Sequence, residues 1–162
     1  MTQNVRFILD VHLGKLARLL RMTGFDTLYR NDLEDQEIIS IAESDNRIVL
    51  TRDRGILKNK RVKRGHFVNS PYAKEQLREI ISTFQLGDSI NFLSRCIACN
   101  GTIEKVEKED ILEELKPGTS RYFNEFFRCR DCGKIYWEGS HFERMMDFYE
   151  KIKEEMGLDK NP

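Results

Sequence analysis

The sequence lacks the features of membrane and secreted proteins. It contains no run of about 18 apolar residues that would span a bilayer. Its first residues lead directly into a strand-like segment, without the basic region and long apolar stretch of a signal peptide. We therefore expect an intracellular, cytoplasmic protein with no membrane association.

The chain also lacks a net charge, because its 27 basic residues equal its 27 acidic residues. The ratio of basic to acidic residues nevertheless differs along the chain. Residues 1–95 carry 16 basic and 12 acidic residues, whereas residues 96–162 carry 11 and 15. The most basic segment is 52–64, where seven lysines and arginines accompany a single acid, Asp53. This segment either binds a polyanion or forms a solvated loop and helix face, and charge alone does not separate the two.

Cysteine is absent from the first 95 residues and then occurs only as two Cys-x2-Cys pairs, separated by 29 residues. The pairs are Cys96 with Cys99 and Cys129 with Cys132. This is zinc-ribbon spacing, because two residues between thiolates allow a tight turn that aims both sulfurs at one ion. Four thiolates leave no open position for water, so we expect a structural zinc ion.

Other chemistry is possible for four cysteines. A reducing compartment argues against two disulfides, and two matched pairs argue against a redox Cys-x-x-Cys motif. An iron ion in the same tetrahedral site stays open.

The sequence around the second cysteine pair predicts a small module closed by a helix. Residues 111–115 have a short helical pattern that ends before Pro117. The run from Ser140 to Glu143 predicts a capping box that starts a helix ending near Gly157. Six aromatic residues nearby either pack around the metal or stack on RNA bases; they are Tyr122, Phe123, Phe126, Phe127, Tyr136 and Trp137.

Strand-like and helical patterns alternate before the cysteines, which predicts an α/β domain with a parallel sheet. A chain of 162 residues can bury one good core plus a small module stabilised in another way. We therefore expect one domain over residues 1–92 and a zinc module with its closing helix over 93–162. The strands are expected at 5–10, 27–29, 47–51 and 66–69, and the helices at 12–23, from 35, at 55–58 and at 70–84.

Three acids fall at matching places in this sheet. Asp10 and Asp53 follow strands, at the edge where open parallel sheets bind ligands, and Asp35 begins a helix. Converging carboxylates need cations between them, and oxygen ligands favour magnesium or manganese. Such ions activate water and stabilise the leaving oxygen of a phosphodiester. Taken singly, each acid is better explained by a helix cap or a turn, and it is their joint placement that favours a site.

Several separated motifs resemble the Mut-seven C-terminal ribonuclease domain. The resemblance covers nearly the whole chain and implies a PIN-like nuclease fold with helices on both faces of the sheet, followed by a zinc ribbon. Besides both cysteine pairs, the motifs are Phe7–Asp10, Leu13–Arg21, Gly24–Thr27, Leu50–Arg54 and Tyr136–His141.

The resemblance also implies a reaction, the metal-dependent hydrolysis of RNA. Asp10, Asp35 and Asp53 match the acids that hold one or two magnesium or manganese ions. PIN nucleases commonly add another acid between the first two, for which the candidates here are Asp26, Asp32, Glu34 and Glu37.

Four arginines near these acids are expected to position phosphates, as basic side chains do in nucleic-acid complexes. The alternative is solvation on a helix surface or pairing with the carboxylates. They are Arg18, Arg21, Arg52 and Arg54.

Two other functions compete with ribonuclease activity. A non-catalytic zinc-ribbon protein could bind RNA through its ribbon and basic segment, with the acids serving as caps. A phosphatase of the haloacid-dehalogenase kind would use Asp10 as a nucleophile. That chemistry usually needs a second acid two residues later, and His12 stands there instead.

Overall fold

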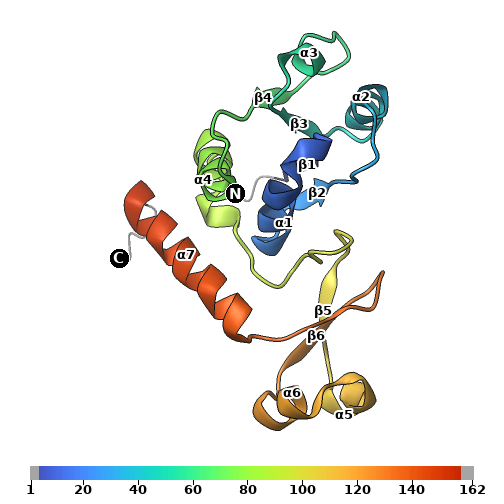
Figure 1. The fold of residues 1–162 in the computed structure, drawn as a ribbon, viewed down its shortest axis with the longest axis vertical. Coiled ribbons are helices and arrows are strands. Elements are labelled where there is room, and N and C mark those ends of the chain that lie inside the picture. The colour runs from blue at the N-terminus through green and yellow to red at the C-terminus, as the bar shows by residue number, and fades with distance from the viewer. Residues whose placement is uncertain (1–3, 158–162) are drawn as a thin grey trace. The chain divides into compact units, whose positions relative to one another are not determined.

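The computed structural model describes residues 4–157, and the chain divides into two compact units after Asn100. The first unit is built on a four-stranded parallel sheet with strand order β2-β1-β3-β4 (Figure 1). Phe7 of the central strand β1 pairs with Thr27 of β2 on one side and with Ile48 of β3 on the other. The predicted α/β class and parallel sheet are confirmed. The strands are β1 (Arg6–Leu9), β2 (Asp26–Leu28), β3 (Ile48–Thr51) and β4 (Gly65–Phe67).

Helices follow the strands, as expected for parallel connections. They are α1 (Gly14–Met22) after the 3-10 turn η1 (Val11–Leu13), α2 (Asp35–Ser44), α3 (Arg54–Leu57) and α4 (Ala73–Thr83), with the 3-10 turn η2 (Gly87–Ser89) after them.

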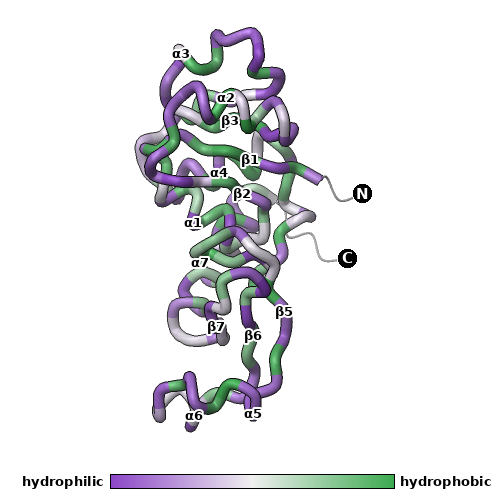
Figure 2. Tube along the Cα trace, turned by 90° about the vertical axis from the view of Figure 1, so that its right-hand side faces the viewer, coloured by the Kyte–Doolittle hydropathy of each residue, from purple (hydrophilic) through white to green (hydrophobic). Residues whose placement is uncertain are grey.

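Alternate residues of β1 face opposite sides of the sheet, and helices cover both. Ile8 and Val49 belong to a buried cluster with Ile38 and Ile39 of α2. On the other side, the ring of Phe7 meets that of Phe84, which follows α4, edge to face at 5.7 Å. Each such buried side chain contributes about 1.5–3 kcal/mol, so the two layers fix the sheet between its helices. Figure 2 shows β1 and β3 as hydrophobic segments.

The second unit contains an antiparallel sheet in the order β5-β6-β7. Ile103 pairs with Cys129, and Phe127 pairs with Tyr136. The unit ends in the long helix α7, so the predicted ribbon and closing helix are both present. The strands are β5 (Ile103–Val106), β6 (Phe126–Cys129) and β7 (Ile135–Tyr136), and the helices are α5 (Lys108–Ile111), the 3-10 turn η3 (Leu112–Glu114), α6 (Pro117–Tyr122) and α7 (Ser140–Met156).

Helix ends in this unit differ from the sequence expectation. Gly139 is the N-cap of α7, and Ser140 is its first helical residue, so the predicted capping box is wrong. Pro117 opens α6, because its fixed φ angle and missing N–H suit the first turn of a helix. The predicted end of α7 is correct, since Gly157 caps it with a φ of 66°.

The aromatic residues of this unit are used mainly in packing. Phe126 is fully buried, and its ring lies 6.2 Å from that of Trp137. Tyr136 is buried as well, whereas Tyr122 is 74% exposed. No helix within residues 4–157 is both long enough and apolar enough to cross a membrane.

Candidate functional site

Two of the predicted acids lie at the carboxyl edge of the parallel sheet. Asp10 directly follows β1 and is 6% exposed, and Asp53 follows β3 and is exposed. The hydroxyl group of Thr51 connects them. It donates to Asp10 Oδ2 at 2.9 Å and accepts the main-chain N–H of Asp53 at 2.9 Å. The end of β3 therefore fixes the side chain of one acid and the backbone of the other.

The Asp10 carboxylate is buried and accepts its hydrogen bonds from uncharged groups. Besides the Thr51 hydroxyl, it accepts the main-chain N–H of His12 at 3.2 Å. Within residues 4–157 no lysine, arginine or histidine forms an ion pair with it. A buried charge is costly unless it is paired, so this carboxylate is suited to a cation. Its oxygens are the hard ligands that magnesium and manganese prefer.

Asp53 also has a local structural role, because its Oδ1 accepts the N–H of Gly55 at 2.8 Å and caps α3. Asp35 is the first residue of α2 and is exposed. The capping role considered for Asp35 belongs instead to Glu34, which forms a reciprocal capping box with Glu37. Among the residues that the structure describes, the three aspartates do not form a group tight enough to share one ion as they stand.

The candidates for an additional acid are used in other ways. Asp26 lies at the start of β2, away from Asp10, where its Oδ1 accepts from Arg47 and Asn100 at 2.8 and 2.7 Å. Burial raises the pKa of Asp26, but the bonds from Asn100 and Arg47 outweigh it and hold this pKa below its ordinary value. Asp32 pairs with Arg30 on the surface.

Arg21 does not reach the acidic edge with its guanidinium. It is 6% exposed and donates to the carbonyl oxygens of Thr27 at 2.9 Å and Ile97 at 2.9 Å, with a longer bond of 3.4 Å to Tyr29. The structure gives this side chain a structural role in place of the phosphate contact expected from the sequence. Arg18, one turn earlier on α1, is exposed.

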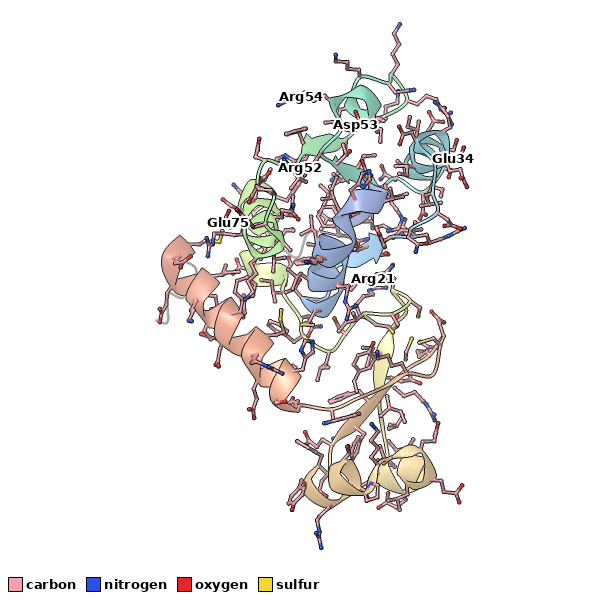
Figure 3. The ribbon with its side chains drawn as sticks, viewed as in Figure 1. Arg21, Glu34, Arg52, Asp53, Arg54 and Glu75 are labelled. Atoms are coloured by element: carbon pink, nitrogen blue, oxygen red, sulfur yellow. The ribbon has the colours of Figure 1, made fainter. Side chains whose placement is uncertain are left out.

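Arg52 and Arg54 flank Asp53 (Figure 3). Arg52 Nη1 donates to the carbonyl oxygens of Val68 and Asn69 at 2.8 and 2.7 Å, so this arginine also holds the chain that leaves β4. The guanidinium of Arg54 lies on the ring of Phe67, with 4.0 Å between Cζ and the ring centroid.

Glu79 of α4 also binds β4 and the segment that follows it. It accepts the N–H of Asn69 at 3.0 Å and contacts His66 Nε2 at 2.5 Å. Burial raises the pKa of Glu79, but the bonds from His66 and the backbone of Asn69 and Ser70 outweigh it and lower this pKa. Sequence reasoning missed Thr51, Phe67 and Glu79; a threonine two residues before a strand-end acid was the available signal for Thr51.

The four cysteines form the second candidate site. Their sulfur atoms all lie within 4.8 Å of one another, close enough to hold a metal ion such as zinc, and none of the four is in a disulfide. A tetrahedral zinc ion with bonds of about 2.3 Å needs sulfur atoms about 3.8 Å apart. This separation falls within the 4.8 Å limit that the four sulfur atoms satisfy.

The two cysteine turns share one backbone design. The N–H of Asn100 donates to the Cys96 carbonyl at 2.9 Å, and the N–H of Gly133 donates to the Cys129 carbonyl at 3.1 Å. Both residues have a left-handed backbone, with φ of 72° and 80°. Gly101 is needed for another reason, because a Cβ atom there would lie 2.8 Å from Cys129 Sγ. These features match the knuckles of a four-thiolate metal site.

Comparison with known proteins gives one result. The family model described as the Mut7-C RNAse domain matches residues 5–149, which include the acids at the sheet edge and all four cysteines. This match confirms the resemblance inferred from the motifs. No curated protein and no solved structure matches the chain.

Proposed function

The chain belongs to the Mut7-C RNAse domain family, and from this premise we propose that it is a magnesium- or manganese-dependent ribonuclease. Family membership indicates ribonuclease activity in general and RNA as the substrate. The metal requirement, the acidic site and the division into a nuclease domain (1–92) and a zinc module (93–162) are our proposal.

The main support is the environment of Asp10. Its carboxylate is buried, no cationic side chain within residues 4–157 pairs with it, and it is tied through Thr51 to the backbone of Asp53. Asp35 is the first residue of α2, the helix that follows β2 in the parallel sheet. Asp35 therefore lies toward the edge of the sheet at which the strands end. We propose that Asp10, Asp35 and Asp53 hold one or two ions, and that Asp35 approaches the other two when an ion binds.

The bound ions would supply the activation of a water molecule and the stabilisation of the leaving oxygen. The residues of the chain position the reactants. Asp10 and Asp53 provide oxygen ligands, and Thr51 fixes the carboxylate of Asp10 and the backbone of Asp53. Arg18, Arg52 and Arg54 place basic groups for the phosphates. No side chain needs to form a covalent bond with the RNA.

We further propose that zinc in the four-cysteine site is structural, because a closed shell of four thiolates leaves no position for water or substrate. The reaction then belongs to the acidic edge of the parallel sheet.

The test is to replace the acids one at a time by asparagine. Asp53→Asn keeps a side-chain oxygen for the Gly55 cap, so the fold should be retained. We expect Asp10→Asn and Asp53→Asn to slow metal-dependent cleavage of RNA by more than about 100-fold. Asp88→Asn is the matched control, because Asp88 is an exposed aspartate of η2 and is not a candidate for the acidic site.

Cleavage by Asp53→Asn at the wild-type rate, with fold and zinc content intact, would contradict the acidic site. RNA binding without cleavage under any divalent ion would favour the alternative, a non-catalytic zinc-ribbon protein that binds RNA.

A further inference from the structure

Phe67 brings aromatic and cationic groups together at the acidic edge of the sheet. It is the last residue of β4 and pairs in register with Thr51, the residue that connects Asp10 and Asp53. The ring is half-buried, and the guanidinium carbons of Arg54 and Arg52 lie 4.0 and 5.9 Å from its centroid. An aromatic ring covered by arginine thus lies beside the acids.

The two arginines are held differently. Arg52 donates from Nη1 to two carbonyl oxygens of the segment after β4, so these bonds restrain its guanidinium beside the sheet. The guanidinium of Arg54 instead contacts the ring of Phe67. At 4.0 Å, close to van der Waals separation, its guanidinium covers the ring. Arg54 is exposed as a residue, so solvent and a ligand can reach its side chain.

A supported guanidinium of this kind is a flat, positively charged surface. Nucleobases stack on arginine planes as they do on aromatic rings, and the charge of the arginine also attracts the adjoining phosphate. A base stacks in this way only after leaving its own helical stack, which favours single strands. Arg54 is the neighbour of Asp53 in the chain, so a base placed on it belongs to a nucleotide near the acids.

We propose that Arg54, supported by Phe67, is a nucleobase-stacking subsite and that the substrate is single-stranded RNA. This inference rests on the proposed function for the identity of the nucleic acid. The subsite lies at the start of the basic segment 52–64, in which Lys58, Lys60, Lys63 and Arg64 are also exposed. Those charges act on phosphates along the strand, whereas Arg54 acts on one base.

The experiment measures binding of a fluorescein-labelled 12-nucleotide uridine RNA by fluorescence anisotropy, using the zinc-loaded full chain without added magnesium or manganese. A series of strands carries one abasic nucleotide at successive positions. For the wild type, we expect one position at which loss of the base raises Kd about five- to a hundredfold, and a matching RNA duplex that binds more weakly than the single strand.

The variants separate stacking from charge. Arg54→Lys keeps the positive charge but removes the planar guanidinium. This variant should bind the intact strand as weakly as the wild type binds the sensitive abasic strand. Its affinity for that abasic strand should be no lower than its affinity for the intact strand. Phe67→Leu, which removes the support beneath Arg54, should behave in the same way once its thermal unfolding confirms folding. Lys60→Ala is the control for charge and should weaken all strands by one common factor.

A flat abasic series for the wild type, or Arg54→Lys binding every strand like the wild type, would overturn the stacking subsite. The same protein is then tested for cleavage with added metal. Abasic discrimination without cleavage would leave the subsite standing and remove the proposed function, whereas cleavage with a flat abasic series would remove the subsite alone.

Discussion

The hydroxyl group of Thr51 is shared by two acidic residues. Its proton goes to Asp10 Oδ2, and its oxygen accepts the N–H of Asp53. Thr51 has no exposed surface, so water cannot replace the hydroxyl if it is removed. Its loss would leave a buried carboxylate oxygen of Asp10 and a partly buried main-chain N–H of Asp53 with one partner fewer.

Replacing Thr51 by valine keeps the shape of the side chain and removes these two bonds. We expect Thr51→Val to lower the free energy of unfolding, measured in urea, by about 1–3 kcal/mol. The rate of RNA cleavage should also fall, because Asp10 and Asp53 lose their common anchor. Thr51→Ser is the matched control and should retain most of both quantities, and a valine variant as stable as the wild type would contradict the role of the hydroxyl.

Individual residues also show what a sequence can and cannot predict. The placement of Asp10 and Asp53 at strand ends followed from short apolar runs that stop at an acid, a local pattern. Arg18 is exposed and Arg21 is buried, because the two residues lie on different sides of α1. Arg21 lies four residues after the buried Ala17, and this spacing already places it on the buried side.

At the scale of elements, α1 is joined to β2 and to the first cysteine turn by Arg21. Its guanidinium donates to the carbonyl oxygens of Thr27 in β2 and of Ile97, between Cys96 and Cys99. All these groups belong to the first unit. One planar side chain thus fixes three segments with respect to one another.

Lysine at position 21 keeps the charge but cannot make several separated bonds at once. We expect Arg21→Lys to lose about 1.5–3 kcal/mol of unfolding free energy. Arg18→Lys, an exposed change on the same helix, should stay within about 0.5 kcal/mol of the wild type. Urea unfolding of the two variants checks this, and equal stability would show that the Arg21 bonds contribute nothing.

The order of elements was predictable, and their ends were less so. Short apolar runs located all four parallel strands, most clearly β1 and β3, which are buried on both faces. Helix starts depend on the backbone angles of one residue, which explains why Glu34 caps α2 and Gly139 precedes α7. Strand order depends on contacts between distant segments, and no local pattern encodes it.

At the scale of the whole molecule, the two units differ in what stabilises them. The parallel sheet has a buried core on both faces, whereas the second unit has a short antiparallel sheet that includes Cys129. Structural zinc contributes about 10–16 kcal/mol in zinc-finger peptides, so we expect the second unit to depend on the proposed zinc ion, for which Cys129 and Cys132 would supply two of the four thiolates.

Removal of the metal by a chelator should therefore affect the units unequally. We expect the amides of β5 and β6 to lose protection in hydrogen exchange, while those of β1 and β3 remain protected. Native mass spectrometry should count one zinc ion before chelation and none after it. Unchanged exchange in β5 and β6 after confirmed loss of the metal would contradict a structural role for zinc.

The position of β2 at the border of the parallel sheet has a consequence for solubility. Border strands offer main-chain groups to which another chain can add a strand, a common start of aggregation. Here the N–H of Thr27 is bonded to Asn100 Oδ1 at 2.9 Å, and Asn100 directly follows Cys99. The turn that contains Cys99 therefore also protects the border of the sheet. If the proposed zinc ion holds this turn in place, we expect loss of the metal to promote aggregation through β2.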